Sequence, residues 1–104
     1  MDEMIIEELL SEVLGVNIKR VINLSSPNKV YYDGELGTDV INIYELAHKC
    51  KEWAFDKMFF LSSGFDTDGA FCLDRMNNKS FIAETEPEAI FKACQWVLEK
   101  KERK

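Results

Sequence analysis

Long hydrophobic runs are absent from this chain of 104 residues, and so are paired cysteines. No apolar stretch approaches the roughly 20 residues that a membrane-spanning helix needs. The N-terminal segment MDEMIIEELL is acidic where a secretory signal is basic, so we expect no export. Three cysteines, Cys50, Cys72 and Cys94, make an odd count without a CxxC motif. This pattern favours a reducing cytoplasm, with the thiols packed as small hydrophobic groups.

Catalytic and metal-binding motifs are also scarce. His48 is the only histidine, and it precedes Cys50 by two residues on a predicted helix, so the two side chains point to different sides. The chain has no GxSxG, HExxH or glycine-rich phosphate loop, and cysteines 22 residues apart do not have the spacing of a zinc site. Glu84, Glu86 and Glu88 are close in sequence, but acids are favourable at a helix N-terminus anyway. We predict a protein that is no enzyme and has no cofactor and no metal.

Basic residues are few at the N-terminal end. Residues 1–41 carry eight acids and three bases, a net charge of −5, out of −6 for the whole chain. Such a surface repels a phosphate backbone, so we expect no direct nucleic-acid binding. The C-terminal KKERK is too short to change that, and it suits the negative end of a helix dipole.

The segment SSGFDTDGAFCLD, residues 62–74, contains the run most similar to a metal site. A calcium loop of the EF-hand type that starts at Asp66 would place Ala70 and Phe71 at its fifth and sixth positions, where an oxygen ligand and a glycine are needed. The alternative is a tight turn, because Asp68 and Gly69 tolerate positive φ between two apolar runs. We therefore predict a turn.

Hydrophobic periodicity and capping signals predict three helices and five strands. Helices are expected over residues 1–15, 43–54 and 86–101, with Gly15 as a stop and with Asn42 and Thr85 as N-caps. Strands are expected over residues 17–24, 29–32, 57–62, 70–75 and 80–85, with a turn at Ser25–Asn28 and a polar loop at Asp33–Asp39. The predicted class is α+β, a small antiparallel sheet with a three-stranded meander packed by helices, in the order α-β-β-α-β-β-β-α.

We interpret residues 1–104 as a single domain. Residues 1–41 would form an acidic N-terminal helix with a β-hairpin, and residues 42–101 a helix–meander–helix core.

Two features exceed what a simple core requires. Several aromatic residues lie outside the apolar helix stripes, and they suit an interface or the cover of an open sheet face: Tyr31, Tyr32, Tyr44, Phe55 and Phe65. Acidic residues gather in the first helix, in Asp33–Asp39 and in Asp66–Asp74. Such acids act as a solubility device, or they imitate phosphates before a basic groove of a partner.

Residues 42–101 resemble the phage ABA-sandwich domain, a family of small phage and prophage proteins. The likeness rests on the helix NIYELAHKCKEWA, the following meander and the junction AETEPEAI into a closing helix. It implies an α-β-α sandwich and a phage or prophage origin, and it brings no catalytic residues. Residues 1–41 have no counterpart in the family.

These observations lead to two hypotheses from different classes. The first is a small acidic protein that binds a protein partner in the bacterial cytoplasm, at its sharpest an inhibitor of a CRISPR-type immune nuclease that acts by steric and electrostatic occlusion. The second is a homodimeric structural or accessory phage module without a host target. The predicted partner-binding residues are Tyr31, Tyr32, Asp33, Glu35, Asp39, Phe65, Asp66 and Asp68.

Overall fold

The computed structural model describes residues 7–22 and 28–102, with side chains up to residue 100. Three helices and two three-stranded antiparallel sheets make up this part of the chain, so the predicted α+β class is confirmed. The elements are α1 (Glu7–Leu14), β1 (Ile18–Ile22), β2 (Lys29–Gly34), β3 (Gly37–Asn42), α2 (Ile43–Asp56), β4 (Leu61–Asp66), β5 (Gly69–Asp74), β6 (Lys79–Ala83) and α3 (Glu86–Glu102). The expected helix over residues 1–6 and the turn residues Ser25–Pro27 lie outside the described ranges.

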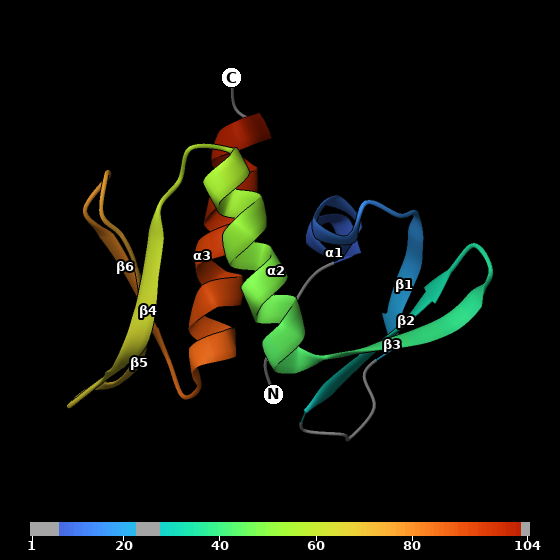
Figure 1. Cartoon of the computed structure of the whole chain (residues 1–104), viewed down its shortest axis with the longest axis horizontal. Helices are drawn as coiled ribbons and strands as arrows, with labels where there is room; N and C mark the ends of the chain where they lie inside the picture. Colours follow the sequence, from blue (N-terminus) through green and yellow to red (C-terminus); the bar gives the residue numbers. More distant parts are fainter. Residues whose placement is uncertain (1–6, 23–27, 103–104) are drawn as a thin grey trace.

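The helices lie between the two sheets (Figure 1). Sheet A has the strand order β1-β2-β3 and packs against α1, whereas sheet B has the order β4-β5-β6 and packs with all three strands on α3. Helix α2 runs beside α3 and also contacts α1. Because strands pair only with their neighbours in sequence, both sheets are simple meanders.

One hydrophobic core joins the elements of both halves. Leu9 and Leu10 of α1 are fully buried in it, and Ile18 and Val30 of sheet A face the same cluster. Helix α2 contributes the whole stripe predicted from its periodicity: Ile43, Leu46, Ala47, Cys50, Trp53 and Ala54. Helix α3 adds Phe91, the largest of the fully buried side chains.

The predicted helix ends are confirmed at three places. Gly15 follows α1 with φ of 70°, and its N–H donates to the carbonyl of Ser11 at 2.9 Å. The Oδ1 atom of Asn42 accepts from the N–H groups of Tyr44 and Glu45 at 2.8 and 3.3 Å. Thr85 Oγ1 accepts from the N–H of Glu88 at 3.3 Å. Each cap satisfies backbone groups that the helix itself leaves without a partner.

The prediction of a polar loop over Asp33–Asp39 is wrong. Asp33 and Gly34 end β2, only Glu35 and Leu36 form the turn, and β3 begins at Gly37. The predicted order therefore lacks one strand. Most of β3 is exposed, so it does not show the polar–apolar alternation of a half-buried strand.

The predicted strand over residues 57–62 is displaced, because β4 begins only at Leu61 and reaches Asp66. The residues before it terminate α2. Met58 takes a left-handed conformation with φ of 71°, and the N–H groups of Met58 and Phe59 donate to the carbonyls of Phe55 and Ala54, both at 2.9 Å. This is the Schellman arrangement, in which the residue at the Met58 position is usually glycine.

Replacing Met58 by glycine is expected to raise the free energy of unfolding by about 0.5–1 kcal/mol. The left-handed conformation costs a residue with a side chain about 1–2 kcal/mol, and glycine is free of this cost. The greater freedom of glycine in the unfolded chain offsets part of the gain. The side chain of Met58 is 71% exposed, so little packing is lost. Urea unfolding followed by circular dichroism measures the change. The control is Met76→Gly, at a similarly exposed residue without positive φ, which should lower stability. Equal effects of the two changes would contradict this account.

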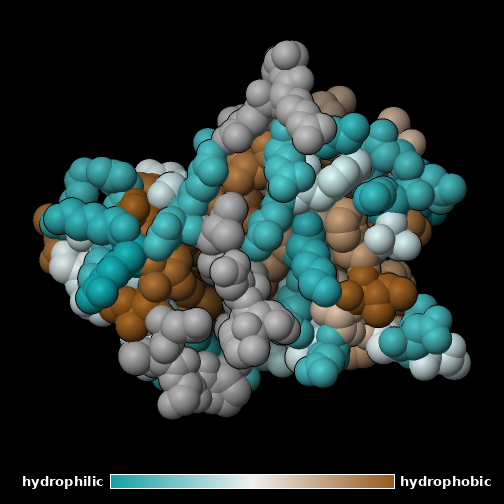
Figure 2. Space-filling model, turned by 180° about the vertical axis from the view of Figure 1, so that it is seen from behind, coloured by the Kyte–Doolittle hydropathy of each residue, from teal (hydrophilic) through white to brown (hydrophobic). Residues whose placement is uncertain are grey.

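In the described part of the chain, no helix or strand packs on the second face of sheet A. Ile22, Tyr31 and Val40 form a row across its three strands on the face opposite Val30, and Val40 is 43% exposed. From behind, Figure 2 shows hydrophobic surface among hydrophilic side chains on the side of the molecule that sheet A forms. None of the helices in the described part of the chain is long and apolar enough to cross a bilayer.

Candidate functional site

The hairpin of β2 and β3 turns sharply over two residues. Gly34 and Gly37 pair on either side of Glu35 and Leu36, and Gly37 has φ of 121°, which favours glycine. The side chain of Leu36 is fully exposed, with a relative exposure of 104%. The hairpin tip thus presents an apolar side chain beside a carboxylate.

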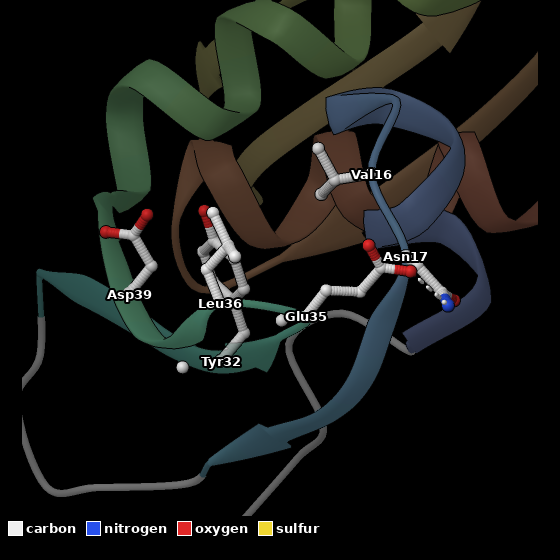
Figure 3. A pocket seen from close by; sticks show the side chains of 8 residues that line it. Val16, Asn17, Tyr32, Glu35, Leu36 and Asp39 are labelled. Atoms are coloured by element: carbon white, nitrogen blue, oxygen red, sulfur yellow. Dashed lines mark hydrogen bonds between the residues drawn. The ribbon is translucent and has the colours of Figure 1, made fainter.

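A pocket of about 200 Å³ opens between this hairpin and the segment that connects α1 to β1 (Figure 3). Val16 and Asn17 come from the connecting segment, and Tyr32 comes from the middle of β2. The Nδ2 atom of Asn17 donates to Oε2 of Glu35 at 3.2 Å, which joins the two walls. The full lining is Val16, Asn17, Tyr32, Gly34, Glu35, Leu36, Gly37 and Asp39.

Tyr32 and Asp39 are cross-strand neighbours in this pocket. Burial raises the pKa of the Tyr32 phenol, and the negative charge of Asp39 and a hydrogen bond to that carboxylate raise it further. Asp39 Oδ1 also accepts from the N–H of Val40 at 2.8 Å. The pocket therefore combines a neutral phenol with two carboxylates beside the exposed apolar side chains of Val16 and Leu36, an arrangement that suits a cationic group with an apolar stem.

Asp33 lies on the other face of the same hairpin. Its carboxylate accepts from Thr38 Oγ1 at 2.6 Å and from Arg20 Nε at 2.8 Å. These two bonds, the one from Thr38 first, hold the pKa of Asp33 below its ordinary value. A lowered carboxyl pKa stabilises the fold above the pKa of the unfolded chain, and this contribution is lost as the pH falls through the folded-state pKa.

We expect Thr38→Val to raise the pKa of Asp33 toward its ordinary value, because the first of these bonds is removed. An NMR titration of the carboxyl carbon measures it. Thr67→Val, in the two-residue turn between β4 and β5, serves as the control and should leave the pKa of Asp33 unchanged. No difference between the two variants would show that Thr38 has no such role.

The remaining predicted residues form a second group at the turn between β4 and β5. Phe65 is 68% exposed, and Asp66 Oδ1 accepts from the N–H of Asp68 at 2.9 Å. Gly69 follows with φ of 118° and pairs with Asp66, so the predicted turn is confirmed. Only Thr67 and Asp68 form the turn itself, since β4 continues to Asp66 and β5 begins at Gly69.

The predicted partner-binding residues are thus divided between two places. Tyr31, Tyr32, Asp33, Glu35 and Asp39 belong to sheet A, whereas Phe65, Asp66 and Asp68 belong to sheet B, and helices separate the two sheets (Figure 1). Only three of the eight line one pocket, namely Tyr32, Glu35 and Asp39. The sequence prediction missed Val16, Asn17 and Leu36. Only Leu36 had a signal in the sequence, as a leucine inside a polar, glycine-flanked segment.

The cysteines and the histidine stand apart from this pocket. All three thiols are buried, Cys94 Sγ donates to the carbonyl of Cys50 at 3.4 Å, and burial raises the pKa of Cys72 to about 12. His48 is exposed and lies 3.3 Å from Glu52, one helical turn further on. Within residues 7–22 and 28–100, no three His, Cys, Asp or Glu side chains are placed to hold a metal ion together.

Comparison of the chain with protein-family models, with curated proteins and with solved structures finds no match.

Proposed function

We propose that the chain is a non-catalytic protein-binding module that takes a basic side chain of a partner protein into the pocket beside the β2–β3 hairpin. The observation that carries the proposal is the composition of this pocket, where Glu35 and Asp39 stand beside the apolar Val16 and Leu36. A lysine or arginine side chain matches both properties, because its head is cationic and its stem is apolar. The net charge of −6 favours the approach of a basic partner.

The test uses N-acetyl-arginine amide as a probe, followed by NMR. We expect millimolar binding that shifts the resonances of Tyr32 and Leu36 and that weakens as ionic strength rises from about 0.05 to 0.5 M, since exposed charges are screened. The double variant Glu35→Gln with Asp39→Asn should lose the binding. The matched control, Asp66→Asn with Asp68→Asn, removes the same two charges at the other hairpin and should retain it. Equal binding by both double variants, or none by the wild type, would overturn the proposal.

The narrower version of this function is inhibition of a CRISPR-type nuclease by a phage or prophage protein in the bacterial cytoplasm. Its support is that carboxylates on the hairpin could occupy the phosphate positions of a basic nucleic-acid channel. A cleavage assay with a purified guide-loaded nuclease, with and without the protein, tests this version. Unchanged cleavage by the main nuclease types would rule it out and leave the broader proposal standing.

A homodimeric accessory module is the second candidate, and the row of Ile22, Tyr31 and Val40 on the face of sheet A opposite Val30 favours it. Two such faces would bury apolar surface against each other. Sedimentation equilibrium at high protein concentration decides this point, because a monomer there would exclude the dimer.

A further inference from the structure

The two sheets have four edge strands, β1, β3, β4 and β6. An edge strand exposes a row of backbone N–H and C=O groups that can pair with another chain. In an antiparallel pair, alternate residues direct these groups toward the neighbouring strand, and the rest direct them outward. The two-residue turns determine which residues belong to each set. The pairs Gly34–Gly37 and Asp66–Gly69 flank these turns and are hydrogen-bonded to each other, so their backbone groups point toward the neighbouring strand.

On three of the four edges, at least one outward backbone group bonds to a side chain of the chain itself. Helix α1 covers β1, where the N–H groups of Ile18 and Val21 donate to the side chains of Ser11 at 3.3 Å and Glu7 at 3.4 Å. On β3, the N–H of Val40 donates to Asp39, as described above. On β6, the carbonyl of Ile82 accepts from Lys92 Nζ of α3 at 3.0 Å. These contacts protect the edges against pairing.

Strand β4 is different. The register with β5 directs the backbone groups of Leu61, Ser63 and Phe65 outward. In the part of the chain that the structure describes, no side chain bonds to these backbone groups. The segment LSSGF also carries no charge that would repel a second strand. It is therefore an edge that remains able to pair.

Helix α2 forms a wall beside this edge. Lys51 Nζ donates to Ser63 Oγ at 3.1 Å, and that hydroxyl donates to Glu86 Oε2 at 2.6 Å, so α2, β4 and α3 are joined at one point. The stripe of α2 beside it has an exposed aromatic residue near each end, Tyr44 and Phe55, with the exposed His48 and the half-buried Lys51 between them. Tyr44 is 59% exposed and Phe55 61%.

Two hollows follow this stripe, and both include His48 and Lys51. The larger has a volume of about 570 Å³ and is lined by Phe55, Phe60 and Leu61, with Glu52 and Asp56 among its other residues. Phe55 and Phe60 meet edge to face at 5.3 Å between ring centres. The smaller has about 170 Å³ and lies between the N-terminal turns of α2 and α3.

We propose that the edge of β4 and the adjacent stripe of α2 bind an extended segment of a protein partner, which adds a fourth strand to sheet B. The backbone of the segment would pair with Leu61, Ser63 and Phe65. Side chains on alternate residues would face α2, so an aromatic one would enter the larger hollow against Phe55 and Phe60. A neighbouring basic side chain would meet Glu52 and Asp56.

The occupant is an extended segment and not a second copy of this chain. A second β4 would bring its own α3, which covers the same face of its strand. Neighbouring strands lie about 4.8 Å apart and packed helices about 8–10 Å apart, so that α3 would enter the space that α2 already fills.

The test begins with selection of twelve-residue peptides from a displayed random library on the full chain. We expect the selected sequences to combine an aromatic with a basic residue, and their synthetic forms to shift the NMR resonances of residues 61–65 and of Phe55. Two forms of each peptide are then compared, one N-methylated on its odd-numbered residues and one on its even-numbered residues. One form should bind at least about tenfold more weakly and the other nearly as well as the unmodified peptide, because only one set of N–H groups faces β4.

The matched protein variants are Phe65→Pro and Phe65→Ala. Both remove the ring, but only proline removes an outward N–H, and this residue lies at a position that does not bond to β5. We expect Phe65→Pro to bind at least about tenfold more weakly than Phe65→Ala. Glu35→Gln with Asp39→Asn should bind the peptide normally, which separates this inference from the proposed function. Three results would overturn the inference: failure to select any peptide, insensitivity to N-methylation, or a dimer of the chain that competes for this edge.

Discussion

Replacing Phe91 by alanine is expected to lower the free energy of unfolding by about 3–5 kcal/mol. Phe91 of α3 is fully buried in the core cluster that joins both halves, so truncation removes apolar contacts and leaves a cavity that rigid neighbours fill only in part. A domain of this size has a total stability of about 5–15 kcal/mol, so the variant would be at the margin of folding.

Urea denaturation followed by circular dichroism measures the change as a shift of the midpoint at constant slope. Phe65→Ala is the matched control, because it removes the same ring from a residue that is 68% exposed. It should alter stability by about 0.5 kcal/mol or less. Similar losses in the two variants would show that the described core is not the one that stabilises the protein.

The second large effect is expected at Asp74, the only buried charged residue in the described part of the chain. Its Oδ1 accepts from the N–H of Met76 at 3.1 Å, and its Oδ2 accepts from Nδ2 of Asn77 at 2.8 Å. The carboxylate therefore organises the turn in which Asn78 takes a left-handed conformation with φ of 55°. Asp74→Ala should cost about 2–3 kcal/mol, since it removes the two hydrogen bonds to the carboxylate that hold this turn.

Asp74→Asn keeps one acceptor oxygen and should cost less than Asp74→Ala. Amide hydrogen exchange adds a local measurement, in which β6 should lose protection in Asp74→Ala before β2 does. Asp68→Ala, at an exposed turn aspartate, is the control and should leave both stability and exchange nearly unchanged. A stable Asp74→Ala protein with protected β6 would mean that the turn forms without this carboxylate.

Helices α2 and α3 could be predicted because their signals are local. An apolar stripe and a cap residue lie within a few residues of one another in each helix. Asn42 and Thr85 hold the cap positions predicted for them, and Pro87 lies in the first turn of α3, where its missing N–H costs nothing. Strand β3 was missed because it lies at the edge of its sheet and has few buried residues. The residues before Leu61 were mistaken for a strand because Met58 stands where a glycine usually marks the end of a helix.

The candidate pocket could be predicted only in part. Tyr32, Glu35 and Asp39 stood out as aromatic and acidic residues near one loop, but their meeting depends on the register Tyr32–Asp39. Val16 and Asn17 reach the pocket through the packing of α1 on β1, which no local pattern encodes. The division into two sheets follows from which strands pair, and the acidic segments therefore face different directions.

The neighbour-only pairing of the strands has a consequence for how fast the chain folds. After α1, the chain consists of two successive meander-plus-helix units, and every β-ladder joins segments that are adjacent in sequence. Such local contacts give a low contact order, so the loop-closure entropy paid before the first native contacts form is small. Each hairpin can close within microseconds, and docking of the two units through the buried faces of α2 and α3 is left as the slower, final step.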